Sequence, residues 1–166
     1  MKVALCLMGV VGSAEFKYGA GKPIDPRIGH YFYKKHLLNH NNTDIFIHSW
    51  STEFKNLLLD LYKPKKHLIE KQINFNQNNI RSNSIASRWY STATSIALKT
   101  LYEKENNIEY DFVIIARFDC MFNKDLIFSQ FNKNNFYISH VNECYNELCK
   151  CNIGDMYSDL WAFGNS

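Results

Sequence analysis

The segment YDFVIIARFDCMF, residues 110–122, runs from an apolar stretch directly into two charged side chains. Residues 112–116 are apolar and rich in β-branched side chains, which is typical of a strand buried on both faces. Arg117 and Asp119 follow where this strand should end. Because burying an unpaired charge is costly, we expect these two side chains to face each other, a cleft or a ligand.

Similar apolar segments recur along the chain and alternate with helical patterns. Further strands are predicted at residues 2–11, 43–50, 66–72, 134–141 and 158–166. Helices are predicted at residues 27–40, 51–62 and 84–106. On the last helix, Trp89 and Tyr90 are expected in the core, and apolar side chains recur every three or four residues at Ile85, Trp89, Ala93, Ile96, Ala97 and Leu101. The order β-α-β-α-β-α-β-β-β predicts an α/β fold, with a mostly parallel sheet and helices on both faces.

The overall composition favours one globular domain spanning residues 1–166. Hydrophobic residues make up 46% of the chain and charged residues 21%, a balance that excludes a disordered chain. The net charge of +3 is spread along the sequence and predicts no nucleic-acid partner. No apolar run approaches the ~20 residues of a transmembrane helix. No export signal is recognised, so we expect the five cysteines to be reduced thiols and the protein to be cytoplasmic, in the host cytoplasm if the source is a virus.

Two glycine-containing segments fail as known phosphate-binding motifs. Residues 19–23, GAGKP, lack the Ser or Thr that a phosphate loop requires after Lys22. Residues 9–12, GVVG, contain too few glycines for the dinucleotide fingerprint. The candidate ligand-binding residues therefore come from the ends of the predicted strands, because ligands of open α/β sheets bind beyond the carboxyl ends of parallel strands.

Each of these strand-end candidates has a functional and a structural interpretation. Asp119 can hold a divalent cation on phosphate oxygens, or it can form an ion pair with Arg117, since residues two apart on a strand share a face. His48 can contact a ligand at the rim of the sheet or lie in the core. Arg88, on the predicted long helix, suits a phosphate group or can simply be solvated.

Five segments, in this order and covering nearly the whole chain, resemble a group of bacterial and large-virus glycosyltransferases. They are KVALCLMGVVGS at 2–13, DIFIHSW at 44–50, SRWYS at 87–91, YDFVIIARFD at 110–119 and DLWAFGNS at 159–166. The resemblance implies a Rossmann-like GT-A nucleotide-sugar-binding fold. It also implies transfer of a sugar, such as a hexose, from a nucleoside diphosphate sugar donor to a hydroxyl acceptor such as a glycan.

The same resemblance assigns roles to particular residues. Those expected to border the base, ribose and diphosphate of the donor are Gly9, Val10, Ser13, His48, Arg88 and Arg117. Asp119 would bind Mn²⁺ or Mg²⁺ on the donor diphosphate. Asp159 would lie near the acceptor, and either Asp155 or Asp159 would act as the catalytic base if the enzyme inverts.

The chain departs from the pattern of this group in two places. Arg117 stands where the first carboxylate of the Asp-x-Asp metal motif usually stands. Arg can neutralise diphosphate oxygens directly, so a metal-assisted and an Arg-assisted site both stay open. The sequence also ends at Ser166, before the acceptor-binding elements that such enzymes commonly carry. A nucleotide-sugar-binding module without turnover is therefore the alternative function, and an unrelated methyl or phosphoryl transferase is the third.

Overall fold

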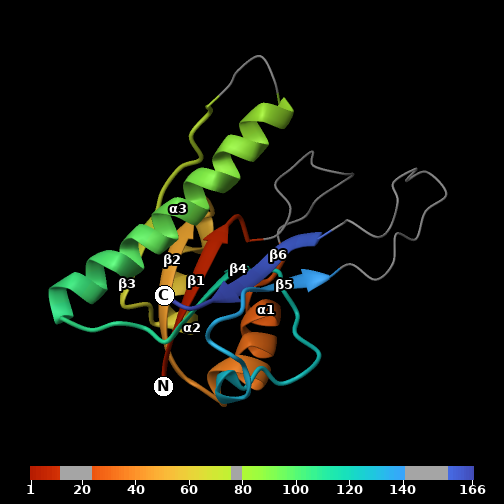
Figure 1. Ribbon diagram of the computed structural model, residues 1–166. Coiled ribbons are helices and arrows are strands. Elements are labelled where there is room, and N and C mark those ends of the chain that lie inside the picture. Colours follow the sequence, from red (N-terminus) through yellow and green to blue (C-terminus); the bar gives the residue numbers. More distant parts are fainter. Residues whose placement is uncertain (12–23, 76–79, 141–156) are drawn as a thin grey trace.

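A six-stranded mixed sheet forms the centre of the protein in the computed structural model, which describes residues 1–11, 24–75, 80–140 and 157–166 (Figure 1). Its strands are β1 (Lys2–Gly9), β2 (Asn42–Ser49), β3 (Lys66–Ile69), β4 (Phe112–Arg117), β5 (Tyr137–His140) and β6 (Tyr157–Gly164). They lie in the order β3-β2-β1-β4-β6-β5. The first four strands are parallel, and β6 runs antiparallel to both β4 and β5. The α/β class and the mostly parallel sheet are thus confirmed.

The helices lie where the apolar periodicity predicts them, with different ends. They are α1 (Pro26–Tyr33), α2 (Lys55–Tyr62) and α3 (Ile80–Asn106). The Asp25 side chain caps α1 by accepting a hydrogen bond of 2.9 Å from the Arg27 amide, and Pro26 fits the first turn. After α1 the chain continues as a π-helical turn at Lys34–Leu38. No helix in the described part of the chain is both long enough and apolar enough to span a membrane.

Alternating side chains of β1 separate two hydrophobic cores, one on each face of the sheet. Val3, Leu5 and Leu7 belong to the larger core, together with buried residues of α1 and α2. Ala4 and Cys6 point to the opposite face and belong to a smaller core, against which Leu98 and Tyr102 of α3 pack. Figure 1 shows the same arrangement, with α3 on one face and α1 and α2 on the other.

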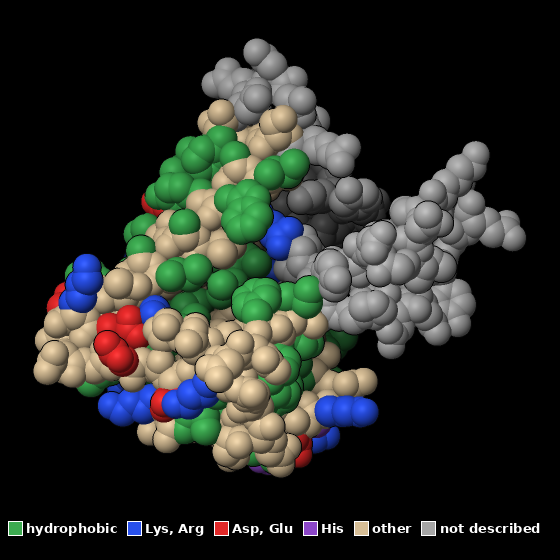
Figure 2. Space-filling view, viewed as in Figure 1, with side chains coloured by type: hydrophobic (Ala, Val, Ile, Leu, Met, Phe, Trp, Pro, Cys, Tyr) green, Lys and Arg blue, Asp and Glu red, His purple; other side chains and the backbone are tan. Residues whose placement is uncertain are grey.

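Helix α3 packs on the sheet with a face that its periodicity does not predict. Trp89 is 63% exposed, so its expected place in the core is wrong, and Ile85 and Leu101 are also exposed. The fully or almost fully buried polar side chains of α3 are instead Ser87, Ser91, Thr92, Ser95 and Lys99. Small serine side chains let the helix approach the small residues of β1. The exposed apolar side chains run along α3 on the face seen in Figure 2.

An aromatic cluster holds the antiparallel part of the sheet on the face away from α3. Phe163 of β6 stacks on Tyr137 of β5, with ring centroids 4.7 Å apart. Phe128 meets Phe163 and Phe112 at centroid distances of 5.0 and 5.2 Å. These ring contacts are of the offset and edge-to-face kinds that aromatic side chains prefer. The cluster therefore fixes β6 beside β4.

Candidate functional site

The carboxyl ends of β1, β2 and β4 lie side by side and form the edge where the site was expected. In the strand register Gly9 is opposite Ser49 and Met8 is opposite Arg117. From β1 the chain first adds β2 and β3 on one side and later crosses to β4 on the other side. The point between β1 and β4 is thus a topological switch point, where ligands of open α/β sheets bind.

Arg117 and Asp119 form a two-point ion pair at the end of β4. Arg117 donates from Nε to Oδ1 of Asp119 at 2.8 Å and from Nη2 to Oδ2 at 2.5 Å. The Arg117 side chain is 36% exposed and that of Asp119 is 20% exposed, so the pair is neither sealed in the protein nor fully solvated. The ion pair expected as one alternative is present, and its guanidinium also reaches the surface of the edge.

Residues 118 and 119 form a turn after β4, and helix α1 contacts the backbone of this turn. The hydroxyl of Tyr33 donates to the Arg117 carbonyl oxygen at 2.5 Å. Gly29 packs so tightly that a β-carbon there would lie 2.1 Å from the carbonyl oxygen of Phe118. Only a residue without a side chain fits such an approach. The turn that bears the ion pair is therefore held by a helix from the larger core.

A divalent cation finds few ligands in the described residues of this edge. Both oxygens of Asp119 accept hydrogen bonds from Arg117. In the described ranges, no group of three or more His, Cys, Asp or Glu side chains is arranged to hold a metal ion. A cation on Asp119 would have to displace the guanidinium. The donor set among the described residues therefore does not favour a resident Mn²⁺ or Mg²⁺ at Asp119, and metal use stays a prediction.

His48 lies directly behind the edge, fully buried between α3 and the segment after β3. Its Nδ1 is 2.6 Å from Oγ of Ser91, and its Nε2 is 3.2 Å from Oε1 of Glu70. Burial lowers the pKa of His48 and outweighs the opposing influence of Glu70. The histidine is accordingly neutral near pH 7, and it belongs to the buried network and not to the exposed surface of the edge.

Both backbone polar groups of Gly9, its N–H and its carbonyl oxygen, form hydrogen bonds at the end of β1. Its N–H donates to Oγ of Ser91 at 2.7 Å. Its carbonyl oxygen accepts from Oγ of Ser49 at 2.9 Å and from the Trp50 amide at 3.2 Å. The φ angle of Gly9 is +95°, which strains any residue with a side chain. The sequence placed Ser49 at the end of the second strand, near the expected nucleotide. It gave no role to Ser91, although the spacing of Ser87, Ser91 and Ser95 marks one face of a helix.

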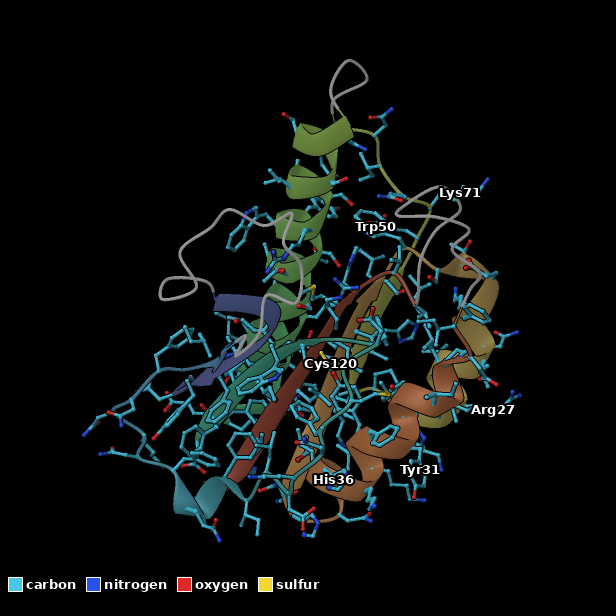
Figure 3. The ribbon with its side chains drawn as sticks, turned by 90° about the vertical axis from the view of Figure 1, so that its right-hand side faces the viewer. Arg27, Tyr31, His36, Trp50, Lys71 and Cys120 are labelled. Atoms are coloured by element: carbon cyan, nitrogen blue, oxygen red, sulfur yellow. The ribbon has the colours of Figure 1, made fainter. Side chains whose placement is uncertain are left out.

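Aromatic rings surround His48 at the same end of the sheet. Trp50 stacks on Tyr90 with centroids 5.4 Å apart, and its ring meets His48 edge-on at 4.5 Å. Figure 3 places Trp50 beside α3, where β2 ends. Its indole Nε1 is buried and has no acceptor among the described residues. A buried donor without an acceptor costs free energy, so the packing of Trp50 on His48 and Tyr90 has to offset this cost.

The remaining predicted residues lie at different distances from this centre. Val10 follows Gly9 and is half-buried, while the guanidinium carbon of Arg88 is 5.8 Å from the ring centroid of Trp89. Asp159 belongs to β6, whose Trp161 pairs with Ala116 of β4, so its backbone lies near the Arg117 end of β4; its side chain is not described. Ser13 and Asp155 lie outside the described residues.

Comparison with known proteins adds no assignment to this geometry. No family model matches the chain, and neither a curated protein nor a solved structure matches it.

Proposed function

We propose that the protein binds a nucleoside diphosphate sugar at the carboxyl edge of its sheet and transfers the sugar to a hydroxyl acceptor such as a glycan. The observation that supports this most is the partly exposed Arg117–Asp119 pair at the end of β4, beside the end of β1. Open α/β sheets bind their ligands at this position. The planar guanidinium matches the oxygens of a diphosphate group, which it can bind through two parallel hydrogen bonds.

The proposed reaction breaks the bond between the anomeric carbon and the diphosphate oxygen and joins that carbon to the acceptor oxygen. Negative charge develops on the leaving diphosphate, and Arg117 stabilises it in the transition state. Asp119 keeps the guanidinium in one orientation before the donor binds. A base removes the proton of the acceptor hydroxyl if the enzyme inverts, and Asp155 and Asp159 are the proposed candidates. If the site uses Mn²⁺ or Mg²⁺ instead, Asp119 would hold the cation after release of the Arg117 guanidinium, and the cation would supply the neutralisation of the diphosphate.

Thermal unfolding with a panel of nucleoside diphosphates and their sugars tests donor binding. A ligand at a hundred times its Kd stabilises the folded state by about 2.7 kcal/mol. We expect Arg117→Ala to abolish this stabilisation. The matched control is Arg27→Ala, which removes another Arg two residues from its aspartate, in the exposed pair with Asp25 on α1. Failure of every nucleotide to stabilise the wild-type protein would overturn the proposal.

Release of free sugar from the stabilising donor separates an enzyme from a binding module. Slow hydrolysis by the wild-type protein and its loss in Arg117→Ala support the transferase. Donor binding without any release supports the nucleotide-sugar-binding module. Repeating the binding measurement with a chelator decides the role of metal, because an Arg-assisted site keeps its donor affinity and a metal-assisted site loses it.

A further inference from the structure

We infer that Glu70, His48 and Ser91 form a buried, directional hydrogen-bond chain that positions the Gly9 peptide, and with it the start of the loop after β1. These residues come from the segment after β3, from β2 and from α3, and they converge behind the edge of the sheet. Their proposed role in donor binding rests on the proposed function. The chain of hydrogen bonds can itself be tested without any ligand.

The direction of each hydrogen bond follows from the two ends of the series, because the Gly9 N–H can only donate and the Glu70 carboxylate can only accept. The Gly9 N–H can only donate, so Oγ of Ser91 accepts at 2.7 Å. The single proton of Ser91 is then left for Nδ1 of His48 at 2.6 Å, since the alternative acceptor, the His48 carbonyl oxygen, is 3.5 Å away. A neutral histidine that accepts at Nδ1 carries its proton on Nε2. That proton is donated to the Glu70 carboxylate at 3.2 Å.

Because His48 and Ser91 are buried, the donor and acceptor roles in these hydrogen bonds depend on the charge of His48. His48 and Ser91 are fully buried, and the Glu70 side chain is 30% exposed at the outer end. The groups facing the imidazole are Glu70 and Ser91 together with the rings of Trp50 and Tyr90, so Glu70 is the one charged group among the described contacts. A protonated His48 donates from both nitrogens. The Ser91 hydroxyl would then lose its acceptor and have to turn toward the distant carbonyl oxygen.

The hydrogen bonds of Glu70, His48 and Ser91 affect ligand binding through Gly9, because none of the three side chains is proposed to contact the ligand. The Gly9 carbonyl is already held by Ser49 and Trp50, and the Val11 amide donates to Oγ of Ser51 at 2.9 Å. Ser91 supplies the remaining bond, which fixes the Gly9 N–H in the peptide between Met8 and Gly9. A loop fixed before binding loses less entropy when the ligand arrives. Glu70, His48 and Ser91 are therefore positioning residues for the proposed donor site.

Nitrogen-detected NMR of the imidazole in the ligand-free wild-type protein is the first test. We expect His48 to carry its proton on Nε2 at neutral pH. The Gly9 amide resonance should titrate together with His48, and Glu70→Gln should move their shared midpoint to lower pH because it removes the nearby negative charge. A proton on Nδ1, or a Gly9 resonance that does not follow His48, would overturn the inference.

Variants of two buried serines on α3 then separate positioning from packing. Ser91→Ala removes the bond to Gly9, while Ser95→Ala is the matched control, because Ser95 is equally buried and donates to Thr92 of its own helix. We expect Ser91→Ala to speed hydrogen exchange of the Gly9 amide roughly tenfold, the value of one ordinary hydrogen bond, and Ser95→Ala to leave it unchanged. Ser91→Thr keeps the hydroxyl and should restore the protection. Equal exchange rates of the Gly9 amide in the two alanine variants would contradict the proposed series of hydrogen bonds.

The donor supplies the final measurement. Ser91→Ala should weaken donor binding by a similar factor and change the rate of sugar release at saturating donor little, because the variant alters the end of β1 at Gly9 and not the diphosphate contacts. If no donor binds while the NMR results hold, the proposed function fails and the hydrogen-bond chain stands. If donor binds but its affinity is unchanged in Ser91→Ala, the positioning role is wrong and the proposed function stands.

Discussion

Apart from Leu98 and Tyr102, which pack on the sheet, the two faces of α3 reverse the usual arrangement of an amphipathic helix. The face on the sheet contains Ser87, Ser91 and Ser95, while the face in solvent contains Ile85, Trp89 and Leu101. On the face of the sheet that α3 covers, β1 presents the small and fully buried side chains of Ala4 and Cys6. The difference teaches that the apolar stripe of a helix does not decide which side is buried when the opposite side offers small residues and satisfied polar groups.

The buried face is stable because its polar groups have partners. Nζ of Lys99 lies 2.8 Å from Oε2 of Glu103 and donates to Oγ of Ser166 at 2.7 Å. Burial by itself would raise the pKa of Glu103, but the hydrogen bonds from Lys99 and the Tyr110 amide outweigh it and hold that pKa below its ordinary value. Ser95 donates to the Thr92 carbonyl at 2.8 Å. A substitution should therefore have very different consequences on the two faces.

Loss of the buried lysine should have the largest effect. Lys99→Ala leaves Glu103 without its ion-pair partner at a site where the two side chains are 7% and 13% exposed. Breaking one side of a buried pair typically costs about 3–5 kcal/mol of unfolding free energy. Denaturant unfolding of Lys99→Ala and of the exposed neighbour Lys104→Ala measures the contrast. A loss below about 1 kcal/mol in Lys99→Ala would show that the pair is effectively solvated.

Enlarging one small residue on each face sharpens the comparison. Ser95→Leu inserts three carbons into a closed contact and should destabilise the protein by about 1–3 kcal/mol. Ala97→Leu adds a similar volume on the exposed face and should change the stability by no more than about 0.5 kcal/mol. The two midpoints of urea unfolding give the result. Equal losses in both variants would mean that the exposed face is covered in solution.

The buried network around Ser91 should also make stability depend on pH. Burial places the folded pKa of His48 below its ordinary value of 6.5, so below that pH the unfolded state binds protons more readily. The stabilisation is therefore complete above pH 6.5 and is lost as the pH falls through the folded pKa. We expect His48→Gln to flatten the slope of unfolding free energy in this window.

A histidine control is needed because His30 on α1 is shifted in the same direction, mainly by burial. His30→Gln should therefore flatten the slope by its own share, and the double variant with His48→Gln separates the two contributions. Equal slopes in the wild-type protein and in His48→Gln would assign the pH dependence to other groups.

Truncation on the exposed face should have the smallest effect. Trp89→Gln removes a ring that is 63% exposed and should alter the unfolding free energy by no more than about 0.5 kcal/mol. Its tryptophan emission should shift to shorter wavelength, because the most exposed ring is lost while the buried Trp50 and the half-buried Trp161 remain. A loss of more than 1 kcal/mol would contradict the solvent exposure of this face.

Local patterns predicted the order of elements because strand and helix periods are properties of short segments. The end of β1 was placed two residues late, at Val11, because the backbone turn at Gly9 is a matter of its φ angle. The insertion of β6 between β4 and β5 was not predictable, since pairing joins distant segments. Burial of the serine face of α3 depends equally on what the sheet presents to it.

The candidate site divides in the same way. Arg117 ends β4 and Asp119 lies two residues later in the following turn, so their contact joins close neighbours in the sequence and could be predicted from it. The contacts of His48 with Glu70 and Ser91 join residues 22 and 43 positions away, and no local pattern specifies them. Sequence reasoning therefore identified the residues at the surface of the edge and missed most of those that hold them in place.

Gly29 packs directly against the turn after β4, so the absence of a side chain at this position determines where Arg117 lies. A β-carbon would lie 2.1 Å from the Phe118 carbonyl oxygen, so alanine would push α1 and the turn apart. The Tyr33 hydroxyl on the same helix would move away from the Arg117 carbonyl in the same displacement. The distance between α1 and the end of β4 thus determines how far the Arg117 guanidinium extends from the turn. Gly29 sets this distance although it has no functional group of its own.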